Sequence, residues 1–320
     1  MGKLTFRGGI HPYEGKELSK DHPIEKYLPK GDLVYPLSQH IGAPSVPCVK
    51  KGDTVLAGQK IADAGGFVSV PLHASVSGTV KGIEKRLNAT GSMVDCIVIE
   101  NDQQYQETEF QEARLEDLTK EEILNRIKEG GVVGMGGAGF PTHAKLNAKA
   151  EYVIINGAEC EPLLRVDQQL MALHTKEILD ALSLVVEHVG AKHGVVALKS
   201  KYKEAISSVQ SIIGNYDKLQ LFELENFYPA GDEQVLVYEV TGRIVPEGGI
   251  PLNVGAIVSN VETMLNIYNA YYYEKPVTDK YVTVTGAVNN TKTLKLPIGM
   301  SVKKAIELAG GTSLTDFVVI

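Results

Sequence analysis

Cysteine is scarce in this chain and tryptophan is absent. The three cysteines, Cys48, Cys96 and Cys160, are widely spaced among 320 residues, and no CxxC pair occurs. A cysteine-ligated iron–sulfur or zinc site therefore cannot be built from this sequence. The eight histidines are scattered without the spacing of metal ligands. We expect no metal site here, and the sparse, odd number of cysteines is typical of a protein from a reducing compartment.

Long apolar runs and an excess of positive charge are also missing. No run approaches the roughly 18 apolar residues of a membrane-spanning helix, and Met1–Ile10 lacks the apolar core of a signal peptide. The net charge of −7 argues against a nucleic-acid-binding surface. With 43% hydrophobic residues, the composition is that of an ordinary globular protein. We expect a cytoplasmic protein that reaches any membrane only through partners.

The residue patterns divide the chain into four segments. Residues 1–31, rich in Pro, Gly, His and Lys, are expected to form an extended arm. Residues 32–112 contain short strand patterns separated by Gly, Pro and Asp. Residues 113–275 alternate strand and helix patterns, which predicts an α/β sandwich with a partly parallel sheet. Residues 276–320 combine strands with a short helix and end in an apolar strand pattern at 317–320, so this module is expected to be truncated.

Within residues 113–275, apolar periodicity indicates individual elements. Strands are expected at 152–156, 194–199 and 219–224, and helices at 167–190, 200–213 and 233–240. Asn260 is a candidate N-cap of a further helix. Ligands of open α/β sheets bind beyond the carboxyl ends of the strands, and the segment 156–161 occupies such a position.

A glycine-rich loop is the most informative local feature. Five glycines fall between Gly131 and Gly139 and are followed by Phe-Pro-Thr. Such a run lets backbone N–H groups converge on an anion, which favours a phosphate-bearing ligand such as a nucleotide or flavin. Its spacing matches the dinucleotide fingerprint. However, the preceding residues carry helix signals, namely a capping box at Thr119–Glu122 and a stop at Gly130. We therefore predict a helix–loop–short helix arrangement instead of a Rossmann strand.

Four phrases occur in a characteristic order: GMGGAGFPTHAK, INGAECEP, FYPAGDEQ and SNVET. Together they resemble the flavin- and NADH-binding subunit of respiratory complex I. The opening FRGGIHP and a barrel-like segment are more similar to the C subunit of the Rnf electron transport complex. The phrases VKKGDTVLAGQKIAD and VPLHASVSGTVKGIE resemble the halves of a biotinyl/lipoyl-type barrel, without a lysine at the tip near 65–67. The tail resembles an SLBB β-grasp module.

The resemblance implies a fold and a set of site residues. The fold is a Rossmann-like α/β sandwich of the complex I flavoprotein-subunit type, with an N-terminal biotinyl/lipoyl-like β barrel and a C-terminal β-grasp (SLBB) module. The implied catalytic residues are Glu159 and Glu161, which would line the hydride-transfer pocket. The implied cofactor-binding residues are Gly134, Gly136, Gly137, Ala138 and Gly139 at the FMN phosphate, Lys145 beside it, Phe140 facing NADH, Asn156 at the flavin, Tyr228, Gly231, Asp232 and Glu233 on the opposite wall, and Asn260 closing the flavin site.

Several of these residues have structural alternatives. Asp232 and Asn260 could serve only as helix N-caps, and the glutamates could be solvated loop residues. His143, next to the glycine loop, is expected at the surface or behind the ligand-contacting residues. Cys160 stands where complex I relatives carry a serine.

The implied function is NADH oxidation by a flavin module of a membrane-associated, ion-translocating NADH:ferredoxin oxidoreductase. Hydride would pass from NADH to FMN, and electrons would continue towards ferredoxin or membrane partners on the cytoplasmic face. Two [4Fe–4S] clusters of the family are expected only in a missing C-terminal part. The acidic residues near the site predict a preference for NADH over NADPH. The alternatives are a subunit associated with a cobalamin or amino-acid reductase, and a non-catalytic scaffold that has lost flavin binding.

Overall fold

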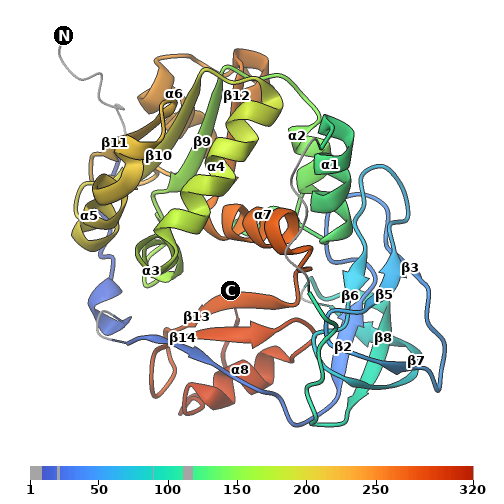
Figure 1. The fold of residues 1–320 in the computed structure, drawn as a ribbon. Helices are drawn as coiled ribbons and strands as arrows, with labels where there is room; N and C mark the ends of the chain where they lie inside the picture. The colour runs from blue at the N-terminus through green and yellow to red at the C-terminus, as the bar shows by residue number, and fades with distance from the viewer. Residues whose placement is uncertain (1–8, 20–21, 89, 111–117, 320) are drawn as a thin grey trace. The chain divides into compact units, whose positions relative to one another are not determined.

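The structure, a computed structural model, describes residues 9–19, 22–88, 90–110 and 118–319. Most of the expected arm's first ten residues, the junction near residue 112 and the final residue 320 lie outside the described residues. The chain forms two compact units, each with its own core (Figure 1). The first contains residues 9–13, 118–162 and 167–275, and the second contains the remaining described residues.

A four-stranded, wholly parallel sheet forms the centre of the first unit, in the order β11-β10-β9-β12. The strands are β9 (Tyr152–Gly157), β10 (His193–Lys199), β11 (Leu219–Leu224) and β12 (Ala256–Asn260). Their helices and 3₁₀ turns are α1 (Lys120–Glu129), α2 (Thr142–Leu146), α3 (Val166–Leu173), α4 (Thr175–Val189), α5 (Lys203–Ile212), η2 (Ile213–Asn215), α6 (Glu233–Thr241), η3 (Pro251–Val254) and α7 (Val261–Tyr273). The expected α/β sandwich is confirmed.

Helices cover both faces of this sheet. Helix α4 packs on β9, β10 and β11 and also against α7, and Figure 1 shows it in front of the strands. On the other face, Leu236 and Val237 of α6 share a buried core with Ile154 and Val258. Because side chains alternate along a strand, Asn156 lies on the same face as Ile154. The sheet therefore presents Asn156 towards the start of α6.

The long helix expected at 167–190 is in fact two helices, which is a correction to the sequence prediction. Chain direction changes at His174, whose φ of −124° and ψ of 36° are not helical. The Thr175 hydroxyl donates to the Met171 carbonyl at 2.6 Å, while Leu173 is largely exposed and Leu170 fully buried. The break at His174 therefore separates α3 from α4.

Helix α1 begins and ends through local signals. Thr119 and Glu122 form the predicted capping box. The left-handed residue that ends the helix is Gly131, with φ of 69°, and not Gly130, whose φ is −66°. The N–H groups of Gly131 and Val132 donate to the carbonyls of Lys128 and Ile127 at 2.8 and 3.3 Å. These two bonds form a Schellman motif, so the predicted stop is displaced by one residue.

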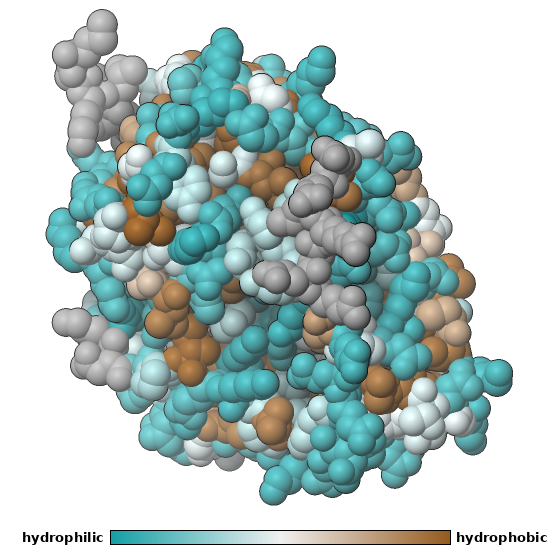
Figure 2. Space-filling view, in the orientation of Figure 1, coloured by the Kyte–Doolittle hydropathy of each residue, from teal (hydrophilic) through white to brown (hydrophobic). Residues whose placement is uncertain are grey.

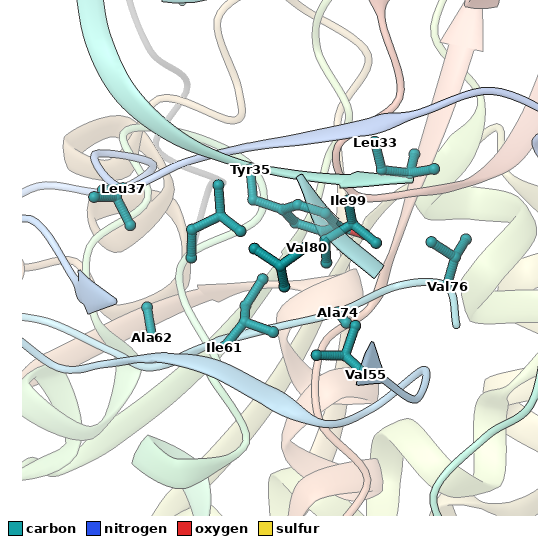
Figure 3. Packing of buried hydrophobic residues seen from close by; sticks show 11 residues of the cluster. Leu33, Tyr35, Leu37, Val55, Ile61, Ala62, Ala74, Val76, Val80 and Ile99 are labelled. Carbon is teal, nitrogen blue, oxygen red and sulfur yellow. The ribbon is translucent and has the colours of Figure 1, made fainter. Parts of the chain in front are cut away.

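The second unit contains the barrel sandwich. One sheet has the order β2-β8-β7-β4 and the other β3-β5-β6. The strands are β2 (Leu33–Pro36), β3 (Val46–Pro47), β4 (Thr54–Val55), β5 (Lys60–Asp63), β6 (Leu72–His73), β7 (Gly78–Leu87) and β8 (Met93–Asn101). Side chains from both sheets, including Tyr35, Ile61 and Ile99, point toward one another and are fully buried (Figure 3). This core explains why short strands are stable here.

The β-grasp module belongs to the same unit. It comprises the antiparallel pair β13 (Asp279–Val284) and β14 (Lys292–Pro297), with α8 (Val302–Leu308) capped by Ser301. A third strand, β1 (Ile24–Lys26), comes from the expected arm and pairs in parallel with β14, after the 3₁₀ turn η1 (Lys16–Ser19). The expected terminal strand is not formed, because the described residues 317–319 pair with no strand.

The surface of the drawn face is mainly hydrophilic, with hydrophobic residues in separate patches (Figure 2). Among the helices of the described residues, none is long and apolar enough to span a bilayer.

Candidate functional site

The residues singled out from the sequence meet at the carboxyl edge of the sheet in the first unit. Strands β9 and β12 are neighbours, and Asn156 and Asn260 are partners in their register. The INGAECEP segment leaves β9 at this edge, and α7 starts there directly after β12. Because all four strands are parallel, their exits open on one side of the sheet, as is usual for ligand sites of α/β proteins.

The glycine loop is closed by backbone hydrogen bonds at its base. The Gly134 N–H donates to the Phe140 carbonyl at 2.9 Å, and the Thr142 N–H donates to the Val132 carbonyl at 3.0 Å. Gly139 has a φ of 69°, which favours glycine. Residues 136–138 at the tip are exposed. The loop therefore has a fixed base and an accessible tip.

Helix α7 anchors the glycine loop. The Met135 N–H donates to the Thr263 hydroxyl at 2.9 Å. A Cβ placed on Gly136 would lie 2.8 Å from the Asn260 side-chain nitrogen, whereas a Cβ on Gly137 would meet nothing within 4 Å. Gly136 is thus required by the protein's own packing, and Gly137 faces open space.

Asn260 is fully engaged as a cap and as a bridge. Its side-chain oxygen accepts hydrogen bonds from the N–H groups of Glu262 and Thr263 at 2.9 and 3.4 Å. Its amide nitrogen donates to the Asp167 carboxylate at 2.9 Å. Asn260 is therefore the N-cap of α7, as one of the two sequence alternatives has it. Asp167, at the start of α3, was not among the predicted site residues.

Hydrogen bonds join the INGAECEP and FYPAGDEQ loops, and a further one lies within INGAECEP. The Asn156 amide donates to the Gly231 carbonyl at 2.8 Å and accepts from the Ala158 N–H at 3.2 Å. The Gly231 N–H points at the Cys160 sulfur at 2.9 Å. A Cβ on Gly231 would approach both Ala158 Cβ and Cys160 Sγ to 3.2 Å. Glycine at 231 is what allows the two loops to approach this closely.

The two candidate catalytic glutamates have different surroundings. The Glu159 carboxylate accepts from the Asp167 N–H and from the Gln168 side chain, both at 2.9 Å. It therefore holds the first turn of α3, and its backbone φ of 40° is unusual for a residue other than glycine. Glu161 is exposed, and the Tyr228 hydroxyl lies 3.4 Å from its carboxylate. Proximity of this charge raises the pKa of Tyr228.

Lys145 reaches from α2 to the start of α6. Its ammonium donates to the Val258 carbonyl at 2.8 Å and lies 3.6 Å from the Glu233 carboxylate. Asp232 is the N-cap of α6, accepting from the N–H groups of Gln234 and Val235 at 3.0 and 3.2 Å. Phe140, at the loop's end, is 37% exposed, so its ring remains accessible.

At several polar residues near the site the structure differs from the sequence analysis or adds to it. His143 is buried and not at the surface, because α2 packs against both α1 and α4. The stabilising partners Asp167, Gln168 and Thr263 were missed. Thr263 lies within the quoted SNVET phrase, whereas no local signal marks Gln168.

Across the part of the chain that the structure describes, no group of three or more His, Cys, Asp or Glu side chains is placed to hold a metal ion.

Three family models match this sequence. Residues 127–269 match the Nuo51 FMN-binding domain, residues 4–104 the RnfC barrel sandwich hybrid domain, and residues 281–316 the SLBB domain. The first spans the glycine loop, β9 and the start of α7, so it covers every candidate site residue.

Individual proteins give consistent matches. The C subunit of the Na(+)-translocating ferredoxin:NAD(+) oxidoreductase complex of Acetobacterium woodii is 39% identical over 97% of this chain and 71% of its own length. Cobalamin reductase PduS of Citrobacter freundii is 43% identical, over 61% of this chain and 43% of its own length. Among solved structures, an NAD+-reducing [NiFe]-hydrogenase matches with a TM-score of 0.53 at 20% identity, covering 62% of this chain and 40% of that one. The last likeness concerns the fold alone.

Proposed function

The chain belongs to the family of ferredoxin:NAD(+) oxidoreductase complex C subunits, and from this premise we propose that its first unit binds FMN and oxidises NADH. The observation that carries the proposal is a set of hydrogen bonds that joins the glycine loop to α7 and the INGAECEP segment to the FYPAGDEQ segment. Asp167 of α3 connects the two pairs, because it bonds to both Asn260 and Glu159. Four loops far apart in the sequence converge on one edge of a parallel sheet, where α/β proteins bind nucleotides.

The residues at this edge fit the phosphate of FMN. Gly137 offers backbone that no neighbouring atom covers within 4 Å of its Cβ position. The exposed tip at 136–138 can turn its N–H groups towards an anion, as glycine-rich loops do. Lys145 supplies a positive charge to the same region, held by the Val258 carbonyl at 2.8 Å. Gly134, Ala138 and Gly139 complete the proposed phosphate loop.

The remaining residues fit the flavin ring and NADH. Bound FMN supplies a ring that accepts hydride from the nicotinamide. Asn156 and Asn260 fix the loops on either side through their amide hydrogen bonds. The exposed side chains of Phe140 and Glu161 and the partly exposed side chain of Tyr228 are proposed to line the nicotinamide pocket. Glu161 keeps a carboxylate beside the Tyr228 hydroxyl at 3.4 Å, where it can accept hydrogen bonds from the cofactor.

Glu159 has a different proposed role from Glu161. Because both of its carboxylate oxygens hold the start of α3, we propose that Glu159 orients the loop and that Glu161 is the glutamate that contacts NADH. Glu233, Asp232 and Gly231 form the opposite wall. Exposed carboxylates there repel the additional phosphate of NADPH, which favours NADH.

We propose that electrons leave this protein towards ferredoxin or membrane-bound partners of the same complex, with the whole assembly at the cytoplasmic face of the membrane. The relative from Acetobacterium woodii is named as one subunit of such a complex. The [4Fe–4S] clusters needed for one-electron transfer would come from outside these 320 residues. The coupled ion movement is a property proposed for the complex, not for this chain by itself.

A flavin-binding and reduction experiment tests this proposal. The protein is mixed with FMN, desalted, and titrated with NADH without oxygen while its absorption near the flavin bands is recorded. We expect one FMN retained per chain and faster bleaching by NADH than by an equal concentration of NADPH. Absence of retained flavin, in both this chain and a longer form of the same protein, would instead identify a scaffold.

Electron delivery to cobalamin is a second candidate, favoured by the 43% identity to cobalamin reductase PduS. That match covers 61% of the chain, while the match to the ion-translocating relative covers 97%, so the first candidate explains more of the sequence. In an assembly that supplies the iron–sulfur clusters, oxidation of the NADH-reduced flavin by ferredoxin or by a cob(III)alamin, compared at equal concentration, separates the two.

A further inference from the structure

We propose that the N-terminal segment Gly9–His11 is a positioning element of the NADH site, which braces Tyr228 through its backbone. The Ile10 N–H donates to the Tyr228 carbonyl at 2.9 Å, and the Tyr228 N–H donates to the Ile10 carbonyl at 2.8 Å. The pair forms an isolated antiparallel bridge within the first unit. The inference rests on the proposed function, in which Tyr228 lines the nicotinamide pocket.

Tyr228 lies in the loop between β11 and α6, outside any helix or longer strand. Strand β11 ends at Leu224 and α6 begins at Glu233. Hydrogen bonds within the loop, such as the one from the Ala230 N–H to the Phe227 carbonyl at 3.3 Å, involve neither the N–H nor the carbonyl of Tyr228. Both groups are taken by Ile10. The segment therefore supplies the backbone pairing that a neighbouring strand would otherwise give.

The contact depends on the backbone of the segment more than on its side chains. The Ile10 side chain is 58% exposed, so little of it is packed. A Cβ on Gly9 would lie 2.8 Å from Phe227 Cδ2 and 3.3 Å from Phe227 Cβ. Only glycine lets the chain lie this close to Phe227 without displacing its ring. The bridge thus fixes the backbone of Tyr228, and with it the position from which the Tyr228 hydroxyl approaches Glu161.

The consequence is a specific effect on NADH binding. With the bridge intact, Tyr228 and Glu161 are held at 3.4 Å before NADH arrives, so binding does not have to order the loop. Loss of one backbone hydrogen bond is expected to weaken NADH binding about fivefold, which corresponds to about 1 kcal/mol. FMN retention is expected to persist, since the glycine loop is anchored separately by Thr263.

The test compares Ile10→Pro with Ile10→Ala. Proline removes the N–H that donates to Tyr228, while alanine keeps both backbone groups and shortens a mostly exposed side chain. For Ile10→Pro we expect a fivefold rise in the KM for NADH, an unchanged rate of flavin reduction at saturating NADH, and faster hydrogen exchange at the Tyr228 amide. Ile10→Ala should match the unsubstituted chain in all three. Gly9→Val, which must displace Phe227, provides a second variant should the proline variant fold poorly, and it should raise the KM in the same direction.

The outcomes separate this inference from the proposed function. Equal KM values and equal Tyr228 exchange in Ile10→Pro and Ile10→Ala, with NADH still reducing the flavin, would overturn the brace alone. If the unsubstituted protein neither retains FMN nor is reduced by NADH, the proposed function fails. The exchange rate at Tyr228 still decides the brace in that case: faster exchange in Ile10→Pro and not in Ile10→Ala supports it, and equal exchange rejects it.

Discussion

The Asn260 side chain occupies the space that a side chain at position 136 would need, since a Cβ on Gly136 would lie 2.8 Å from its amide nitrogen. The same amide donates to Asp167 at 2.9 Å, and its oxygen caps α7. The glycine loop therefore rests on a side chain that cannot move aside without breaking a helix cap and a hydrogen bond to α3. This contact divides the loop's glycines into those fitted to the protein and those facing open space.

Gly137→Val is expected to abolish FMN binding while leaving the protein folded. Its added Cβ meets no protein atom within 4 Å, so the free energy of unfolding should change by less than about 1 kcal/mol. The side chain would, however, fill the space through which the backbone approaches the phosphate. Gly31→Val is a matched control, because a Cβ at Gly31 also meets nothing within 4 Å and the residue lies in the other unit. FMN stoichiometry after desalting checks the prediction, and flavin retained by Gly137→Val would contradict the loop assignment.

Asp232 can be tested as a cap and as a ligand in one series. Asparagine also caps helices, so Asp232→Asn should keep the hydrogen bonds to Gln234 and Val235. Asp232→Ala loses them and is expected to lower the free energy of unfolding by about 1 kcal/mol. Denaturant titrations measure this difference. If Asp232 acts only as a cap, Asp232→Asn binds NADH normally; weaker binding by Asp232→Asn at unchanged stability would assign its charge to the cofactor.

Glu233→Gln is expected to relax the preference for NADH over NADPH. Glu233 is exposed at the first residue of α6, and the mutation removes a negative charge that would face the additional phosphate of NADPH. We expect kcat/KM for NADPH to rise about fivefold, the scale of a partly screened charge interaction of about 1 kcal/mol. Glu223→Gln on β11, an exposed carboxylate outside the site residues, is the control. A ratio of NADH to NADPH activity that stays constant in Glu233→Gln would argue against an electrostatic origin.

The stability of the second unit is expected to fall with acid because of His73. Burial on β6 lowers the pKa of this imidazole to about 4, below its unfolded value of about 6.5. Between these values the unfolded chain binds more protons than the folded one, so stability is lost as the pH falls from about 6.5 to about 4. The loss is on the order of 3 kcal/mol over that range. Urea unfolding at pH 7 and pH 4 should show this loss reduced in His73→Leu; an identical pH dependence in both proteins would rule out His73 as its source.

Local signals account for the parts of the fold that the sequence predicted well. The capping box at Thr119–Glu122 and the caps at Asp232, Asn260 and Ser301 each form between residues that are at most three positions apart. Such contacts depend on little beyond the backbone conformation of one turn. The strand at 219–224 has the predicted bounds, because turn-forming residues on either side of an apolar run leave few other conformations.

The sequence alone predicted which motifs form the candidate site. It did not predict the contacts that each side chain makes there. The order of the glycine loop, INGAECEP, FYPAGDEQ and SNVET was visible in the sequence, and the parallel sheet places them at one edge. That Glu159 holds α3 while Glu161 stays exposed could not be predicted. The two glutamates are chemically identical and two residues apart, so only the path of the chain after β9 distinguishes them.

Local composition and spacing thus determined the succession of elements, most helix starts and the chemistry available to the site. Tertiary structure decided the break at His174, the burial of His143, the pairing of Ile24–Lys26 with β14, and the pairing of Ile10 with Tyr228. Each of these joins residues distant in the sequence or depends on which faces are buried. A backbone N–H or an apolar face can be satisfied by many partners, and the choice among them is made by the packing of the whole unit.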